Sequence, residues 1–98
     1  MSIEEITKII AKDIDGIVAQ RMAERIKTLH DDLQPSVNRY LAGEPVSFTL
    51  GDISLETIME KEQCSLVEAL FSMSVLLENP QLAKRYKSLK FPRGCLSE

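Results

Sequence analysis

Hydrophobic residues recur at an almost constant spacing along the first third of the chain. Nine of them follow steps of three or four residues: Ile3, Ile6, Ile10, Ile14, Val18, Met22, Ile26, Leu29 and Leu33. Such a stripe is typical of one face of an amphipathic helix. Ser2 and Glu5 stand in the spacing of a capping box, which would satisfy the first free backbone N–H groups. The pattern therefore predicts one long helix that begins at residue 3 and ends between residues 31 and 34.

The predicted helix is long for a chain of this size. Thirty residues would span about 45 Å, whereas a compact domain of this length has a radius of gyration of about 13 Å. We therefore expect the nine-residue stripe to form an oligomer interface with a second chain. Its average step, about 3.75 residues, exceeds the period of a straight helix, so the stripe drifts around the cylinder. One half would pack on the chain's own helices and the other on a partner, with the assignment open; Gly16, near the changeover, could mark a bend.

Shorter elements follow the stripe. Pro35 begins a second helix, and Gly43 suits the position just after its end. Residues 46–50 alternate between apolar and polar between Pro45 and Gly51, which predicts a short extended segment. Because no second strand is evident, this segment is either a connector, which we favour, or a strand that pairs with its copy in another subunit.

Capping signals mark the remaining helices. Ser54 can cap a third helix, and Ser65 with Glu68 forms a capping box for a fourth that extends to Glu78. The fourth helix is apolar on almost every side, as expected at the centre of a core or an interface. Pro80 then begins a fifth helix.

These elements predict an all-α fold: a long N-terminal helix, three to four shorter helices and a short extended segment. Residues 1–91 would form a single helical domain, and residues 92–98 a loose C-terminal tail. The 98 residues are 44% hydrophobic and 28% charged, with a net charge of -3, which argues against a surface that binds nucleic acid throughout. No signal peptide or membrane-spanning stretch is evident, and Cys64 and Cys95 have no zinc-site or disulfide spacing. We expect a cytoplasmic protein with reduced cysteines.

Residues 54–77 resemble the helix-turn-helix motif of bacterial DNA-binding regulators. A short helix, a turn at residues 63–65 and a capped second helix carry the resemblance, which implies that the second helix would enter the major groove. The chain departs from the family at Met59, where a small residue is usual, and at Gln63, where Gly is usual. Residues 66–77 contain no Lys or Arg to contact bases or phosphates. Two packed core helices are therefore the favoured interpretation.

Basic residues gather near the C-terminus, within ten positions: Lys84, Arg85, Lys87, Lys90 and Arg93. With Tyr86 and Phe91 between them, they could bind an acidic protein or a nucleic-acid backbone. The simpler interpretation is a solvated helix face with Tyr86 turned inward.

Candidate catalytic chemistry is sparse. His30 is the only histidine, which excludes a multi-histidine metal site, and the solitary glycines form no phosphate-binding loop. Cys64 at the start of a helix could have a lowered pKa, although a small buried filler is the simpler interpretation. We expect no catalytic residues, no metal and no cofactor.

The function that these features favour is a non-enzymatic protein–protein interaction module: an adaptor, regulator or inhibitor that acts as a homodimer or in a hetero-complex. The alternative is a helix-turn-helix-like DNA-binding regulator that uses residues 54–77 or the basic 84–93 segment. A membrane partner is not expected, and no small-molecule substrate is evident.

Overall fold

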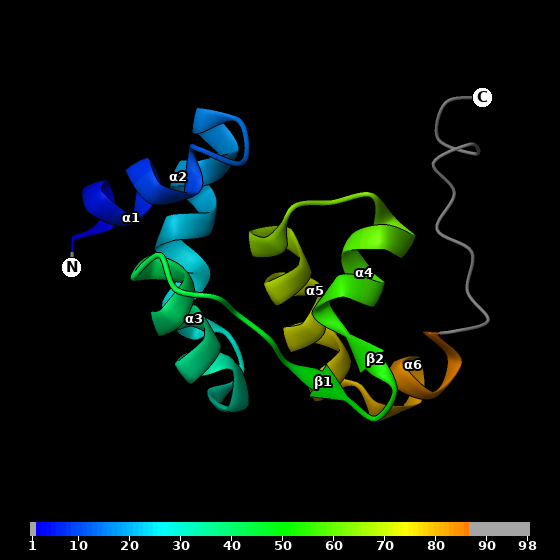
Figure 1. Ribbon diagram of the computed structural model, residues 1–98. Helices are drawn as coiled ribbons and strands as arrows, with labels where there is room; N and C mark the ends of the chain where they lie inside the picture. The colour runs from blue at the N-terminus through cyan, green and yellow to red at the C-terminus, as the bar shows by residue number, and fades with distance from the viewer. Residues whose placement is uncertain (1, 87–98) are drawn as a thin grey trace. The chain divides into compact units, whose positions relative to one another are not determined.

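The predicted all-α fold is confirmed by a computed structural model, which describes residues 2–86 (Figure 1). The described α-helices are α1 (Ile3–Ile10), α2 (Gly16–Arg25), α3 (Gln34–Leu41), α4 (Leu55–Glu62), α5 (Leu66–Glu78) and α6 (Pro80–Arg85). The shorter described elements are the 3₁₀ turns η1 (Ile26–Thr28) and η2 (Asp31–Leu33) and the strands β1 (Thr49–Leu50) and β2 (Ile53–Ser54).

The chain divides by its internal contacts into two units, Met1–Val46 and Ser47–Glu98. That residues 1–91 act as a single domain stays a prediction, and the predicted tail over 92–98 lies outside the described residues.

The prediction of a single long N-terminal helix is wrong. The chain leaves helical geometry after α1 and begins again at Gly16. The Asp15 carboxylate accepts a hydrogen bond from the Ile17 N–H at 2.8 Å and so caps the start of α2. The predicted end is wrong as well, because α2 ends at Arg25 and Leu29 has an extended backbone with ψ 160°. α1 buries Ile6 and Ile10 of the predicted stripe, whereas α2 buries Ala19 and Ala23, which lie outside it.

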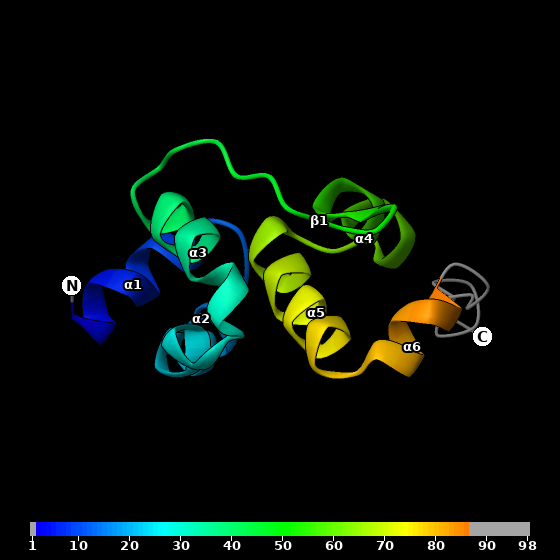
Figure 2. The same ribbon diagram turned by 90° about the horizontal axis from the view of Figure 1, so that it is seen from below.

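The first unit builds its core from α1, α2 and α3. α1 packs on α2, and α3 contacts η1 and η2 (Figures 1 and 2). The α1–α2 connection is tied to α3 by the Tyr40 hydroxyl, which donates a hydrogen bond to the Asp13 carboxylate at 2.7 Å. The apolar side chains buried in this unit are Ile6, Ile10, Ala19, Ala23, Ile26, Leu29, Leu33, Val37, Tyr40 and Leu41.

The second unit begins with a small antiparallel hairpin. Thr49 pairs with Ser54, and Leu50 with Ile53. Gly51 has φ +63°, a conformation that suits glycine in a two-residue turn. The extended segment predicted at 46–50 is therefore a strand only at its end, and its partner lies in the same chain, so neither a plain connector nor pairing with another subunit describes it.

The helices of the second unit follow the predicted caps. The Ser54 side chain caps α4, and Ser65 with Glu68 forms the capping box of α5. α4 and α6 each pack on α5, whose buried side chains include Val67, Leu70 and Met73. Within residues 2–86, no helix is both long and apolar enough to cross a membrane.

Candidate interaction surfaces

The predicted interface stripe is divided between core and surface. Ile6, Ile10, Ile26, Leu29 and Leu33 are buried within the chain. Ile14 and Met22 are partly exposed, whereas Ile3 and Val18 are 50% and 43% exposed. The buried five contribute to the core, so among the stripe residues it is chiefly Ile3 and Val18 that remain accessible to a partner.

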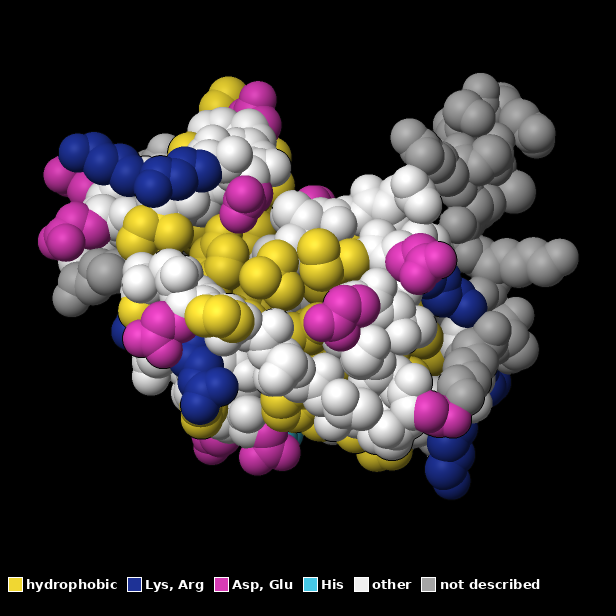
Figure 3. Space-filling view, in the orientation of Figure 1, with side chains coloured by type: hydrophobic (Ala, Val, Ile, Leu, Met, Phe, Trp, Pro, Cys, Tyr) yellow, Lys and Arg dark blue, Asp and Glu magenta, His cyan; other side chains and the backbone are white. Residues whose placement is uncertain are grey.

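Two exposed large hydrophobic residues lie outside the predicted stripe, Ile17 and Val75. The Ile17 side chain is 72% exposed, more than that of any other large hydrophobic residue in the described part of the chain. The periodic spacing that identified Val18 passes over Ile17 and so provides no signal for it. Hydrophobic side chains reach the surface over α1 and α2 (Figure 3).

A shallow groove of about 370 Å³ lies between α1 and α2. Its walls carry one aliphatic side chain, one acid, one base and two neutral polar side chains: Ile3, Glu4, Thr7, Lys8 and Gln20. Glu4 and Lys8 are one helical turn apart and exposed, and neither forms an ion pair within residues 2–86. Ile17 precedes Gln20 by three positions, which places it on the same side of α2. The groove therefore combines apolar area with both signs of charge.

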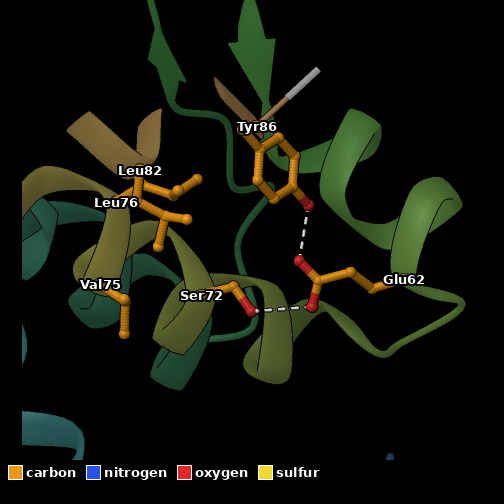
Figure 4. A pocket seen from close by; sticks show the side chains of 6 residues that line it. All are labelled: Glu62, Ser72, Val75, Leu76, Leu82 and Tyr86. Carbon is orange, nitrogen blue, oxygen red and sulfur yellow. Dashed lines mark hydrogen bonds between the residues drawn. The ribbon is translucent and has the colours of Figure 1, made fainter. Parts of the chain in front are cut away.

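The second unit has a smaller pocket of about 160 Å³ where α4, α5 and α6 meet (Figure 4). Val75, Leu76 and Leu82 line one side of it. Opposite them, the Glu62 carboxylate accepts hydrogen bonds from the Tyr86 hydroxyl at 2.6 Å and from the Ser72 hydroxyl at 3.1 Å. Each carboxylate oxygen thus has a hydrogen-bond donor from the protein.

Tyr86 is held in place from several sides. Its side chain is 2% exposed, as the inward orientation predicted from the sequence requires. Burial, followed by the hydrogen bond to Glu62, raises the pKa of the Tyr86 hydroxyl. The Lys61 ammonium lies 5.1 Å from the centre of the Tyr86 ring, within the range of a cation–π contact. The phenol is therefore a neutral structural donor at physiological pH.

The basic segment is only partly described. Lys84 and Arg85 are exposed in the last turn of α6, where the helix dipole favours positive charge. The remaining basic residues, Lys87, Lys90 and Arg93, lie outside the described residues, so binding of an anionic partner by the whole cluster stays a prediction.

The helix-turn-helix-like unit, residues 54–77, has a turn that suits the motif, but the charge of its second helix does not suit DNA binding. Gln63 adopts the left-handed conformation with φ 55°, the geometry for which glycine is usually chosen. α5 carries Glu68 and Glu78 and no basic side chain. Its charge disfavours contact with phosphates.

Cys64 does not have the lowered pKa that a helix start could produce. Burial raises the pKa of the thiol to about 11, and the carboxylates of Glu62 and Glu68 add to the shift. The sulfur lies 3.9 Å from the Ile58 carbonyl oxygen. The prediction of a lowered pKa is therefore wrong, and Cys64 is partly buried in the turn between α4 and α5. No group of potential metal ligands is present among residues 2–86.

Comparison with family models, with curated proteins and with solved structures finds no match to this chain.

Proposed function

We propose that this protein is a non-enzymatic interaction module that binds a protein partner, as a homodimer or in a hetero-complex, through the exposed face of α1 and α2. One observation carries the proposal. Of the four large hydrophobic side chains that the described residues expose, three belong to these two helices: Ile3, Ile17 and Val18.

Burial of these side chains would favour association. Removal of apolar surface from water contributes about 25 cal/mol per Å². A single exposed aliphatic residue is ordinary on a protein surface. Here Ile3 lines a groove, and Ile17 lies on the same side of α2 as Gln20, which lines it too. An apolar area rimmed by charged and polar groups is the usual composition of a protein–protein interface.

The charge of the groove favours a protein over a nucleic acid. Its walls carry one acid, Glu4, and one base, Lys8. Binding of a phosphate backbone depends on several basic groups that displace counterions. A surface of mixed charge lacks that driving force but can pair with a surface of complementary pattern.

The test replaces Ile17, the most exposed large hydrophobic residue among those described. Ile17→Asp should weaken association at least about tenfold in apparent affinity. The weakening is measured as a lower molar mass by light scattering if the partner is a second copy, or as a lower recovery of a co-purifying partner. Circular dichroism should remain unchanged, because the side chain is 72% exposed. Val75→Asp is the matched control, since Val75 is 55% exposed but lies in the second unit. The proposal fails if Ile17→Asp changes neither the mass nor the partners.

A DNA-binding regulator remains the second candidate because of the turn at Gln63. Its affinity for DNA should fall linearly with the logarithm of salt concentration. The Lys84→Ala/Arg85→Ala variant should reduce that slope if the basic segment contacts phosphates. Absence of a salt-dependent complex with the full chain would remove this candidate.

A further inference from the structure

We infer that the partner of the α1–α2 face is a second copy of this chain, docked about a twofold axis with the two α1 helices antiparallel. In this arrangement Glu4 of each copy faces Lys8 of the other. The inference rests on the proposed function and names its partner.

The charge pattern of α1 is the first support. Glu4 and Lys8 stand one turn apart on the wall of the groove. Neither lies within ion-pair distance of an opposite charge within residues 2–86, although Lys8 attracts the Glu5 carboxylate. In a twofold interface, a residue i that meets a residue j also receives j from the other copy. Antiparallel helices reverse the order of the two charges, so the acid of each copy meets the base of the other, twice. Parallel helices in register would instead place like charges opposite each other.

Apolar side chains lie beside these charges. Ile3 lines the groove with Glu4 and Lys8, and Ile17 lies one turn before Gln20, which lines it too. In the proposed dimer, the second copy covers Ile3 and Ile17 of each chain, which are 50% and 72% exposed.

Charge exchange tests this arrangement. Glu4→Lys alone and Lys8→Glu alone should each weaken the dimer at least about tenfold, because each creates two like-charge contacts in place of two ion pairs. The double variant Glu4→Lys/Lys8→Glu should return the dissociation constant to within about threefold of the wild type. An equimolar mixture of the two single variants should form a heterodimer with both pairs restored. Sedimentation equilibrium over a dilution series measures the dissociation constants of the two single variants, the double variant and the mixture.

The design separates pairing from effects on folding. Lysine at position 4 opposes the dipole at the start of α1 in the single and the double variant alike. Because Glu4 and Lys8 are also neighbours on one helix, the double variant restores an attraction within each chain as well. The mixture of the two single variants keeps a like-charge pair within each chain, so its rescue reports on pairing between copies. In 0.5 M salt the differences among the variants should shrink, since the charges lie at the surface.

Three results would overturn the inference. A wild type that stays monomeric at tens of micromolar removes the second copy as partner. A dimer that neither single exchange weakens removes the twofold geometry. Weakening by both single exchanges without rescue in their mixture shows that Glu4 and Lys8 do not pair between copies. The proposed function survives each of these if Ile17→Asp abolishes partner recovery, and it fails separately if Ile17→Asp has no effect.

Discussion

At the scale of single residues, Tyr40 shows how one side chain holds a connection that lacks regular structure. Its hydroxyl donates to the Asp13 carboxylate at 2.7 Å, between positions 27 residues apart in the chain. Burial, and then this hydrogen bond, raise the pKa of the phenol. The contact fixes the α1–α2 connection to α3.

Removal of that hydroxyl should therefore loosen the first unit. Tyr40→Phe is expected to lower the free energy of unfolding by about 1 kcal/mol, less than for a fully buried bond to a charge because Asp13 is exposed. Urea denaturation measures the change. In an Asp13→Ala background the same substitution should cost much less. An equal cost in both backgrounds would show that the hydrogen bond contributes nothing.

Cys64 provides a chemical test of burial. In a Cys95→Ser variant, which leaves one thiol, a pKa near 11 instead of 9.0 lowers the thiolate fraction at pH 8. That change amounts to about a hundredfold, and the greater intrinsic nucleophilicity of a basic thiol offsets part of it. Alkylation by iodoacetamide should be about tenfold slower in the native protein than in urea. Equal rates would mean that Cys64 is open to solvent.

The same shift sets an alkaline limit on stability. Since folding raises the thiol pKa, the stabilisation is fully present below about pH 9.0 and is lost as the pH rises toward about 11. The free energy of unfolding of Cys64→Ala should decline less across this pH window than that of the protein that retains Cys64, as measured by urea denaturation at each pH. Parallel curves would assign the decline to other groups, such as Tyr40 and Tyr86, whose pKa values are also raised.

At the scale of elements, the chain is predictable where the signal is local. Ser54, Ser65 and Pro80 mark helix starts in the sequence and in the structure, because a cap needs only a side chain and its own next turn. The break at Asp15 was predicted only as a bend that Gly16 could mark, because the apolar step of three to four residues runs through it unchanged. That step did not identify the buried face of α2, which consists of Ala19 and Ala23.

The hairpin and the interaction surface were missed for related reasons. Strands of two residues are too short for an alternating pattern to distinguish them from a loop. For the surface, the stripe identified Ile3 and Val18 but also five core residues. Apolar periodicity predicts which residues are buried, but it does not distinguish burial within the chain from burial against a partner. Ile17 could be recognised only once α2 was known to begin at Gly16.

The Asp15 cap should decide between two short helices and one long one. Asp15→Ala removes the acceptor of the Ile17 N–H and should cost about 1 kcal/mol of stability, measured by thermal or urea unfolding. Helical content by circular dichroism should not rise. Glu24→Ala, at an exposed position of the same helix, is the control and should be nearly neutral. A gain in helicity with unchanged stability would favour the continuous helix.

At the scale of the whole molecule, internal contacts divide the chain into units of 46 and 52 residues. A unit of this size can bury only a modest share of its surface, which limits the stability that its own core supplies. The first unit leaves Ile3, Ile17 and Val18 exposed to water, so their apolar surface does not contribute to its core. Association through α1 and α2 would recover that burial and add to the stability of the fold.

Stability should therefore depend on protein concentration. If the folded state is a dimer, each tenfold increase in concentration adds about 1.4 kcal/mol per dimer to the free energy of unfolding. Thermal unfolding of the wild type from about 1 to 100 micromolar should show a rising midpoint. Ile17→Asp should remove the dependence and unfold at the wild-type midpoint of the most dilute sample, whereas Val75→Asp should keep the slope. A wild-type midpoint that does not move with concentration would show that self-association does not stabilise the fold, and stabilisation by the α1–α2 face would then require a different protein.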